Sequence, residues 1–143
     1  AWSVVKKKEL KMALTIQEHE RKTYEDKLHF LINLSPADEL FMQKLNDLIS
    51  RNLTNPDLDV QFVATQMAMS RASLYNKLKQ LADISIGDYI NKFKMEEAVR
   101  LLADKGLSIQ EVSEKAGFSH QRYFSTVFKQ MYGVTPSQYR QDL

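Results

Sequence analysis

Two stretches of the sequence place short polar and basic side chains on one face of an expected helix. Leu74 and Leu78 mark the inner face of the first helix, and Phe124 and Phe128 mark that of the second. The side chains half a turn away must face outward; they are Arg71, Ala72, Tyr75, Asn76 and Lys79, then Gln121, Arg122, Ser125, Thr126 and Lys129. Arg, Asn, Gln, Ser and Thr can hydrogen-bond to base edges in a major groove, whereas Lys suits phosphates.

The starts of these two helices add a second kind of chemistry. Ser70 and Ser119 are the expected N-caps, and His120 follows directly. Helix N-termini attract anions, so two outward-pointing N-termini suit phosphate groups. For His120 itself, a phosphate contact and simple exposure are both open.

An internal repeat surrounds the two helices. The pattern Val63-Ala64-x-x-Met67-Ala68-Met69-Ser70 aligns with Val112-Ser113-x-x-Ala116-Gly117-Phe118-Ser119. Each copy reads as a short helix, a three-residue turn and a second helix, which is the layout of a helix-turn-helix. Gly117 suits the turn of the second copy, but Ala68 stands in the first, where a left-handed conformation costs about 1–2 kcal/mol.

The elements that must position these residues are all predicted to be helices. Gly (4) and Pro (3) are scarce, and no alternating strand pattern competes. Ser35-Pro36 separates an N-terminal segment, 1–35, from a helical domain, 36–143, with seven expected helices. The domain's first helix turns Leu40, Phe41, Leu45, Leu48, Ile49 and Leu53 inward, and later helices begin at Asp59, Ser70, Ser85, Ser108, Ser119 and Thr135.

A long linker helix joins the two expected helix-turn-helix units. The units cover about 60–82 and 108–132, and the linker covers about 86–104, stopped by Gly106. Nineteen residues span about 28 Å, close to the roughly 34–36 Å between successive major grooves on one face of DNA. The domain is neutral overall, but Arg71–Lys79 and Lys115–Arg140 are basic stretches without acids. Double-stranded DNA is therefore the expected partner.

The N-terminal segment has a different rhythm. Leu10, Leu14, Gln17, Arg21, Tyr24, Leu28 and Leu31 follow the heptad spacing of a coiled coil. Residues 6–34 are thus expected to form a helix that pairs in a homodimer, or one that docks on its own domain. The chain begins with Ala1-Trp2 and is expected to be part of a longer protein whose missing region holds a sensor.

Residues 38–143 resemble the two-motif DNA-binding domain of the AraC/XylS family of bacterial transcription regulators. The matching run is Ile109-Gln110-Glu111-Val112-Ser113-Glu114-Lys115-Ala116-Gly117-Phe118-Ser119, then Tyr123-Phe124-Ser125 and Gly133-Val134-Thr135-Pro136. The resemblance implies that both recognition helices enter adjacent major grooves and that the regulator contacts RNA polymerase. Ala68 and Asn76 depart from the usual Gly and Arg of the family.

Residues 27–35 resemble, more loosely, the segment that precedes the phosphorylated helix of membrane-bound hybrid two-component sensors. This implies the cytoplasmic output domain of an inner-membrane sensor regulator, in which the juxtamembrane helix joins directly, or nearly so, to the DNA-binding domain and no kinase lies between them.

Other functions find no support in the residues. Cys is absent, and the four Gly and three His residues are too dispersed for a nucleotide-binding loop or a metal cluster. We therefore expect no enzyme activity, no cofactor and no metal. The remaining alternative is a coiled-coil helical module that binds protein and not DNA.

Overall fold

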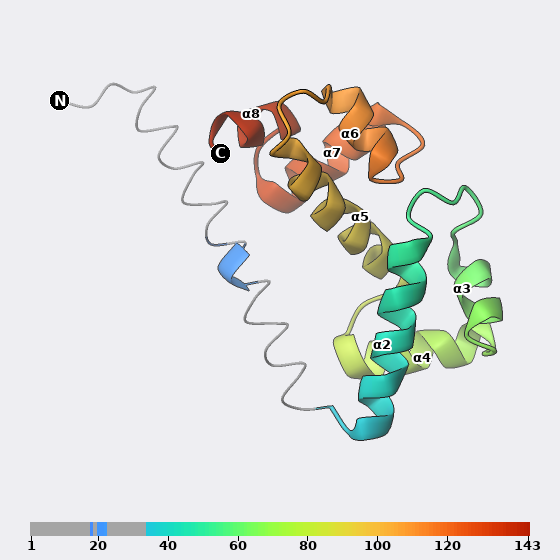
Figure 1. Cartoon of the computed structure of the whole chain (residues 1–143). Helices are drawn as coiled ribbons and strands as arrows, with labels where there is room; N and C mark the ends of the chain where they lie inside the picture. Colours follow the sequence, from blue (N-terminus) through green and yellow to red (C-terminus); the bar gives the residue numbers. More distant parts are fainter. Residues whose placement is uncertain (1–17, 19, 23–33) are drawn as a thin grey trace.

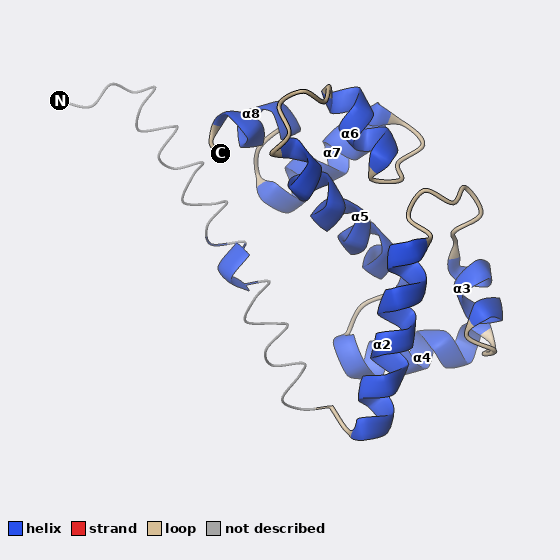
Figure 2. Cartoon of the chain, viewed as in Figure 1, coloured by secondary structure: helices blue, strands red, loops and turns tan. Residues whose placement is uncertain are grey.

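The computed structural model describes residues 18, 20–22 and 34–143. Within 34–143 the chain forms seven helices and no strand (Figures 1 and 2). They are α2 (Pro36–Arg51), α3 (Val60–Gln66), α4 (Arg71–Ala82), α5 (Ile86–Leu102), α6 (Ile109–Lys115), α7 (Gln121–Tyr132) and α8 (Pro136–Gln141). The predicted all-α class is confirmed.

Side-chain caps explain where six of these helices begin. The N-cap oxygens belong to Ser35, Asp59, Ser70, Ser85, Ser108 and Thr135, and each accepts a backbone N–H from the first turn. The predicted cap at Ser119 is wrong. The N-cap of α7 is His120, one residue later, and its side chain makes no capping hydrogen bond.

Two separate apolar cores hold the helices together. The first packs α2, α3, α4 and the start of α5 around residues such as Leu45 and Leu74. The second packs the end of α5 with α6, α7 and α8 around residues such as Phe124 and Phe128. Because α5 contributes to both cores, it is the element that carries one helix-turn-helix unit at each end (Figure 1).

One predicted core position on α2 is wrong. Leu40 was expected to face inward but is 52% exposed, and Met42 is buried in its place. Leu45 and Ile49 fix the buried stripe of α2, and Met42 lies three residues before Leu45 on the same stripe. Leu40 lies five residues before Leu45 and so faces solvent.

The linker helix is shorter than predicted. It ends at Leu102 rather than 104, so its 17 residues span about 26 Å. Gly106 is not its stop signal, because the Gly106 N–H donates to the side chain of Asp104 within the following loop. Instead, the Arg140 guanidinium donates to the carbonyl oxygens of Leu102 at 3.0 Å, Leu107 at 2.7 Å and Asp104 at 3.3 Å.

The N-terminal segment is described only at 18 and 20–22. Glu20 accepts a hydrogen bond from the Tyr139 hydroxyl at 2.8 Å. The pKa of Tyr139 is raised, chiefly because the hydroxyl is buried and secondly because of this hydrogen bond. Most of the predicted coiled-coil stretch 6–34, and the sensor-like segment up to residue 33, lie outside the described residues. None of the described helices is long and apolar enough to cross a membrane.

Candidate nucleic-acid interface

The two halves of the sequence repeat fold into two matching helix-turn-helix units, α3–α4 and α6–α7. In the first turn the Met69 N–H donates to the Ala64 carbonyl at 2.9 Å. In the second, the Phe118 N–H donates to the Ser113 carbonyl at 3.0 Å, with the same spacing along the chain. Both turns pass through a left-handed residue, as the repeat predicted: Ala68 has φ 55° and Gly117 has φ 97°.

The outer face of α4 carries all five residues predicted for it. Leu74 and Leu78 are fully buried. This burial turns the opposite face to solvent, and the exposed residues there are Arg71, Ala72, Tyr75, Asn76 and Lys79. Lys79 pairs with Asp83 at 3.0 Å, which raises the pKa of Lys79. Both side chains of this pair are more than half exposed, so a phosphate can replace the carboxylate at little cost.

The outer face of α7 differs in two details from the prediction. Gln121, Arg122, Thr126 and Lys129 are exposed, but Ser125 is half-buried. The Thr126 hydroxyl donates to the Arg122 carbonyl at 3.0 Å, so this donor is engaged by its own helix. Gln121 and Arg122 are therefore exposed donors at the first turn of α7, and Lys129 is an exposed donor in its last turn.

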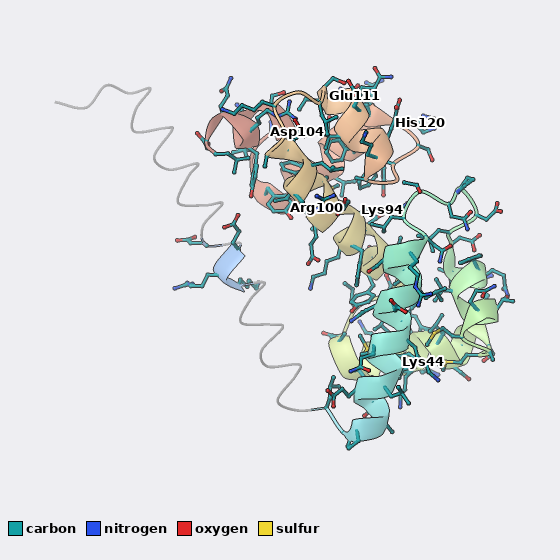
Figure 3. The ribbon with its side chains drawn as sticks, viewed as in Figure 1. Lys44, Lys94, Arg100, Asp104, Glu111 and His120 are labelled. Atoms are coloured by element: carbon teal, nitrogen blue, oxygen red, sulfur yellow. The ribbon has the colours of Figure 1, made fainter. Side chains whose placement is uncertain are left out.

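An open cavity of about 390 Å³ lies at that first turn. Its lining residues are Gln110, Ser113, Glu114, Ser119, His120, Gln121 and Arg122. His120 is exposed at this end of α7 (Figure 3), and no side chain caps the helix there. The backbone N–H groups of the first turn thus lack the cap that the other six helices have.

Sequence reasoning missed the three residues of this cavity that come from α6, which are Gln110, Ser113 and Glu114. Ser113 is 1% exposed, and its hydroxyl has no hydrogen-bond partner. Gln110 lies one turn earlier and donates to Glu114 at 3.2 Å. The repeat did contain a signal, because Ser113 occupies the position where the first copy has Ala64.

Two cations of the predicted basic stretches, Lys77 and Arg140, form contacts within the domain and do not point to solvent as free cations. The Lys77 ammonium lies 2.6 Å from the Asp38 carboxylate of α2 and 5.8 Å from the centre of the Phe41 ring. This pairing lowers the pKa of Asp38. Arg140 holds the carbonyl groups after α5, as described above. Arg71 and Lys79 remain as exposed cations on α4, with Arg122 and Lys129 on α7.

The described residues contain no group of three or more His, Asp or Glu side chains placed to hold a metal ion.

Two helix-turn-helix units on one connecting helix, each with an exposed polar recognition helix, define a two-motif DNA-binding protein. Residues 63–142 match the family model described as a helix-turn-helix domain. The chain belongs to this family and is a DNA-binding domain of the AraC type of transcription regulators. The family is one of DNA-binding transcription regulators.

Three known proteins illustrate the relationship. The chain is 29% identical over 109 residues to histidine kinase P4 of Formosa agariphila, covering 76% of this chain and 8% of the kinase. It is 34% identical over 90 residues to the xylose operon regulatory protein of Escherichia coli K12, covering 63% of this chain and 23% of that protein. The C-terminal domain of AraT, a response regulator from Geobacillus stearothermophilus, is similar in structure, with a TM-score of 0.68 and 34% identity over 78% of this chain and 88% of the other.

The chain thus spans less than a quarter of the length of the histidine kinase and less than a quarter of the length of the xylose operon regulatory protein.

Proposed function

We propose that this domain reads a bipartite DNA sequence, with α4 in one major groove and α7 in the next. The base-reading residues are Arg71, Ala72, Tyr75 and Asn76 on α4, and Gln121, Arg122, Ser125 and Thr126 on α7. Lys79, Lys129 and His120 contact the phosphate backbone. The observation that carries this proposal is the pair of exposed polar faces, one on each recognition helix, at the two ends of α5.

The cavity at the start of α7 supports a phosphate contact in the second unit. The first-turn N–H groups have no side-chain cap, and a helix N-terminus carries a partial positive charge. Arg122 and His120 line the same cavity, and both can donate to an anion. Glu114 also lines it, and Gln110 donates to that carboxylate, which limits the repulsion of an incoming phosphate. This N-terminus is therefore positioned to fix the register of α7 on the duplex.

Replacing Arg122 tests the proposed base contact. A good base contact by an Arg side chain is worth about 1–3 kcal/mol of discrimination. We therefore expect Arg122→Ala to weaken binding by about 5- to 150-fold on a duplex that the wild-type protein retains from a random pool. Preference among bases at one position of that duplex should be lost at the same time. Fluorescence anisotropy against the parent duplex and its single-base variants measures both effects.

The matched control is Arg100→Ala, which removes the same charge from an exposed position on α5. Arg100 pairs with Glu97 on its own helix and lies apart from His120 (Figure 3). We expect this variant to keep the base preference of the wild type. Equal losses in the two variants would contradict base reading by Arg122, since only a general charge effect would then remain.

The wider context of the domain is also part of this proposal. The chain is similar to a small part of a histidine kinase and to the C-terminal domain of a response regulator. These similarities support the view that it is the output domain of a larger, two-component-like sensor. Such a domain acts on DNA in the cytoplasm and passes its signal to RNA polymerase. Pairing of two chains through residues 6–34 stays a prediction.

A further inference from the structure

The loop between α2 and α3, which packs against the first core, touches the second helix-turn-helix unit directly. Leu53 lies in the loop after α2, and Gly117 lies in the turn between α6 and α7 (Figure 1). A Cβ atom at Gly117 would overlap the carbonyl oxygen of Leu53. The backbone of the first half of the domain is therefore packed directly against the backbone of the second unit.

The equivalent turn of the first unit shows that two different constraints act on Gly117, the left-handed φ and the contact with Leu53. Ala68 has the same place in the repeat and a left-handed φ of 55°, yet it carries a Cβ and is exposed. A left-handed turn in this chain thus accepts Ala where the turn faces solvent. At Gly117 the neighbouring Leu53 carbonyl excludes any side chain.

Two side-chain contacts flank this point of packing. The Asn91 side-chain amide on α5 donates to the Tyr123 hydroxyl on α7 at 3.1 Å. The Lys94 ammonium on α5 lies 5.7 Å from the centre of the Phe118 ring (Figure 3), and desolvation there lowers the pKa of Lys94. Asn91 and Lys94 lie between Ile90 of the first core and Met95 of the second. The contact therefore sits where α5 passes from one unit to the other.

We propose that this inter-unit contact fixes the distance and angle between α4 and α7, so that the protein accepts one spacing of its two half-sites. It consists of Leu53, Asn91, Lys94, Gly117, Phe118 and Tyr123. A single helix can bend, whereas a second point of attachment holds the units in one orientation. One added base pair moves the second half-site by about 3.4 Å and about 35°. Asn91, Gly117 and Tyr123 are positioning residues, and this inference rests on the proposed bipartite reading.

The test compares spacer preference in variants that keep the fold. Because Gly117→Ala can unfold the second unit, the informative changes are Tyr123→Phe and Asn91→Ala. Each variant is measured on the duplex that the wild type retains from a random pool, and on versions with one base pair inserted or deleted between the two parts. We expect the wild type to prefer the original spacing by about tenfold or more, and the variants by about threefold or less.

Tyr89→Phe is the matched control, since it removes a hydroxyl from a Tyr–Asn pair inside the first unit. The Tyr89 hydroxyl donates to Asn46 of α2 at 2.5 Å. This variant should keep the spacer preference of the wild type. An unchanged preference in both Tyr123→Phe and Asn91→Ala, or an equal loss in Tyr89→Phe, overturns the inference. If the wild type retains no bipartite sequence at all, the proposed function fails instead.

Discussion

At the scale of single residues, the turns of the two helix-turn-helix units adopt a left-handed backbone conformation with two different residue types. Ala68 adopts φ 55°, where a Cβ is strained against the following carbonyl group. Gly117 adopts φ 97°, and the Leu53 carbonyl leaves no room for a side chain. The first turn therefore stores strain that the second avoids.

Exchanging the residue types should change stability in opposite directions. Ala68→Gly relieves the left-handed strain, and we expect it to raise the free energy of unfolding by about 0.5–1 kcal/mol after the entropy of the unfolded chain is counted. Gly117→Ala adds strain and overlap, and it should lower the free energy of unfolding by at least about 2 kcal/mol. Urea unfolding followed by circular dichroism measures both. A stabilised Gly117→Ala protein would show that the Leu53 contact is absent in solution.

At the scale of elements, α5 is closed by a residue 38 positions further along the chain. The Arg140 side chain comes from α8 and donates to three carbonyl oxygens at and beyond the end of α5. The Leu102 carbonyl belongs to the last turn of α5, where carbonyl groups have no partner within the helix. The other two lie in the loop that follows, and the Asp104 carbonyl also accepts the Leu107 N–H. The last helix thereby holds the end of the linker helix in place.

Removing this guanidinium should destabilise the second unit. Arg140→Met keeps most of the aliphatic chain but loses charge-assisted hydrogen bonds, so we expect the free energy of unfolding to fall by about 2–3 kcal/mol. Arg100→Met, at an exposed position of α5, should leave the urea midpoint nearly unchanged. If the two midpoints shift equally, Arg140 has no special role in closing α5.

Sequence signals within a few residues of one another predicted the helix starts, but not the contacts that packing creates. Caps such as Ser70 and Ser108 were predictable because they depend on residues three positions apart, and the repeat made both turns recognisable. The partners of Lys77 and Arg140 were not predictable, since Asp38 and Leu102 are brought to them only by packing. The same holds for Ser113, whose burial in the cavity depends on how α6 meets α7. Local patterns therefore predicted the exposed faces of α4 and α7, but not which cations form contacts within the fold.

At the scale of the whole molecule, two small cores share one helix. Each core belongs to one helix-turn-helix unit, and α5 spans about 26 Å between them. Centres of successive major grooves lie about 34–36 Å apart. The length of α5 is therefore of the same order as this separation. This arrangement supports the proposed reading of two half-sites by one molecule.

The most direct measurement is selection of bound duplexes from a random pool over a series of salt concentrations, followed by sequencing. We predict one bipartite sequence with its two parts centred about one helical turn apart, and affinity that falls steeply as salt rises. A single enriched block would show that only one unit reads bases. No retention even at low salt would contradict DNA binding by this domain and leave the protein-binding helical module as the account to pursue.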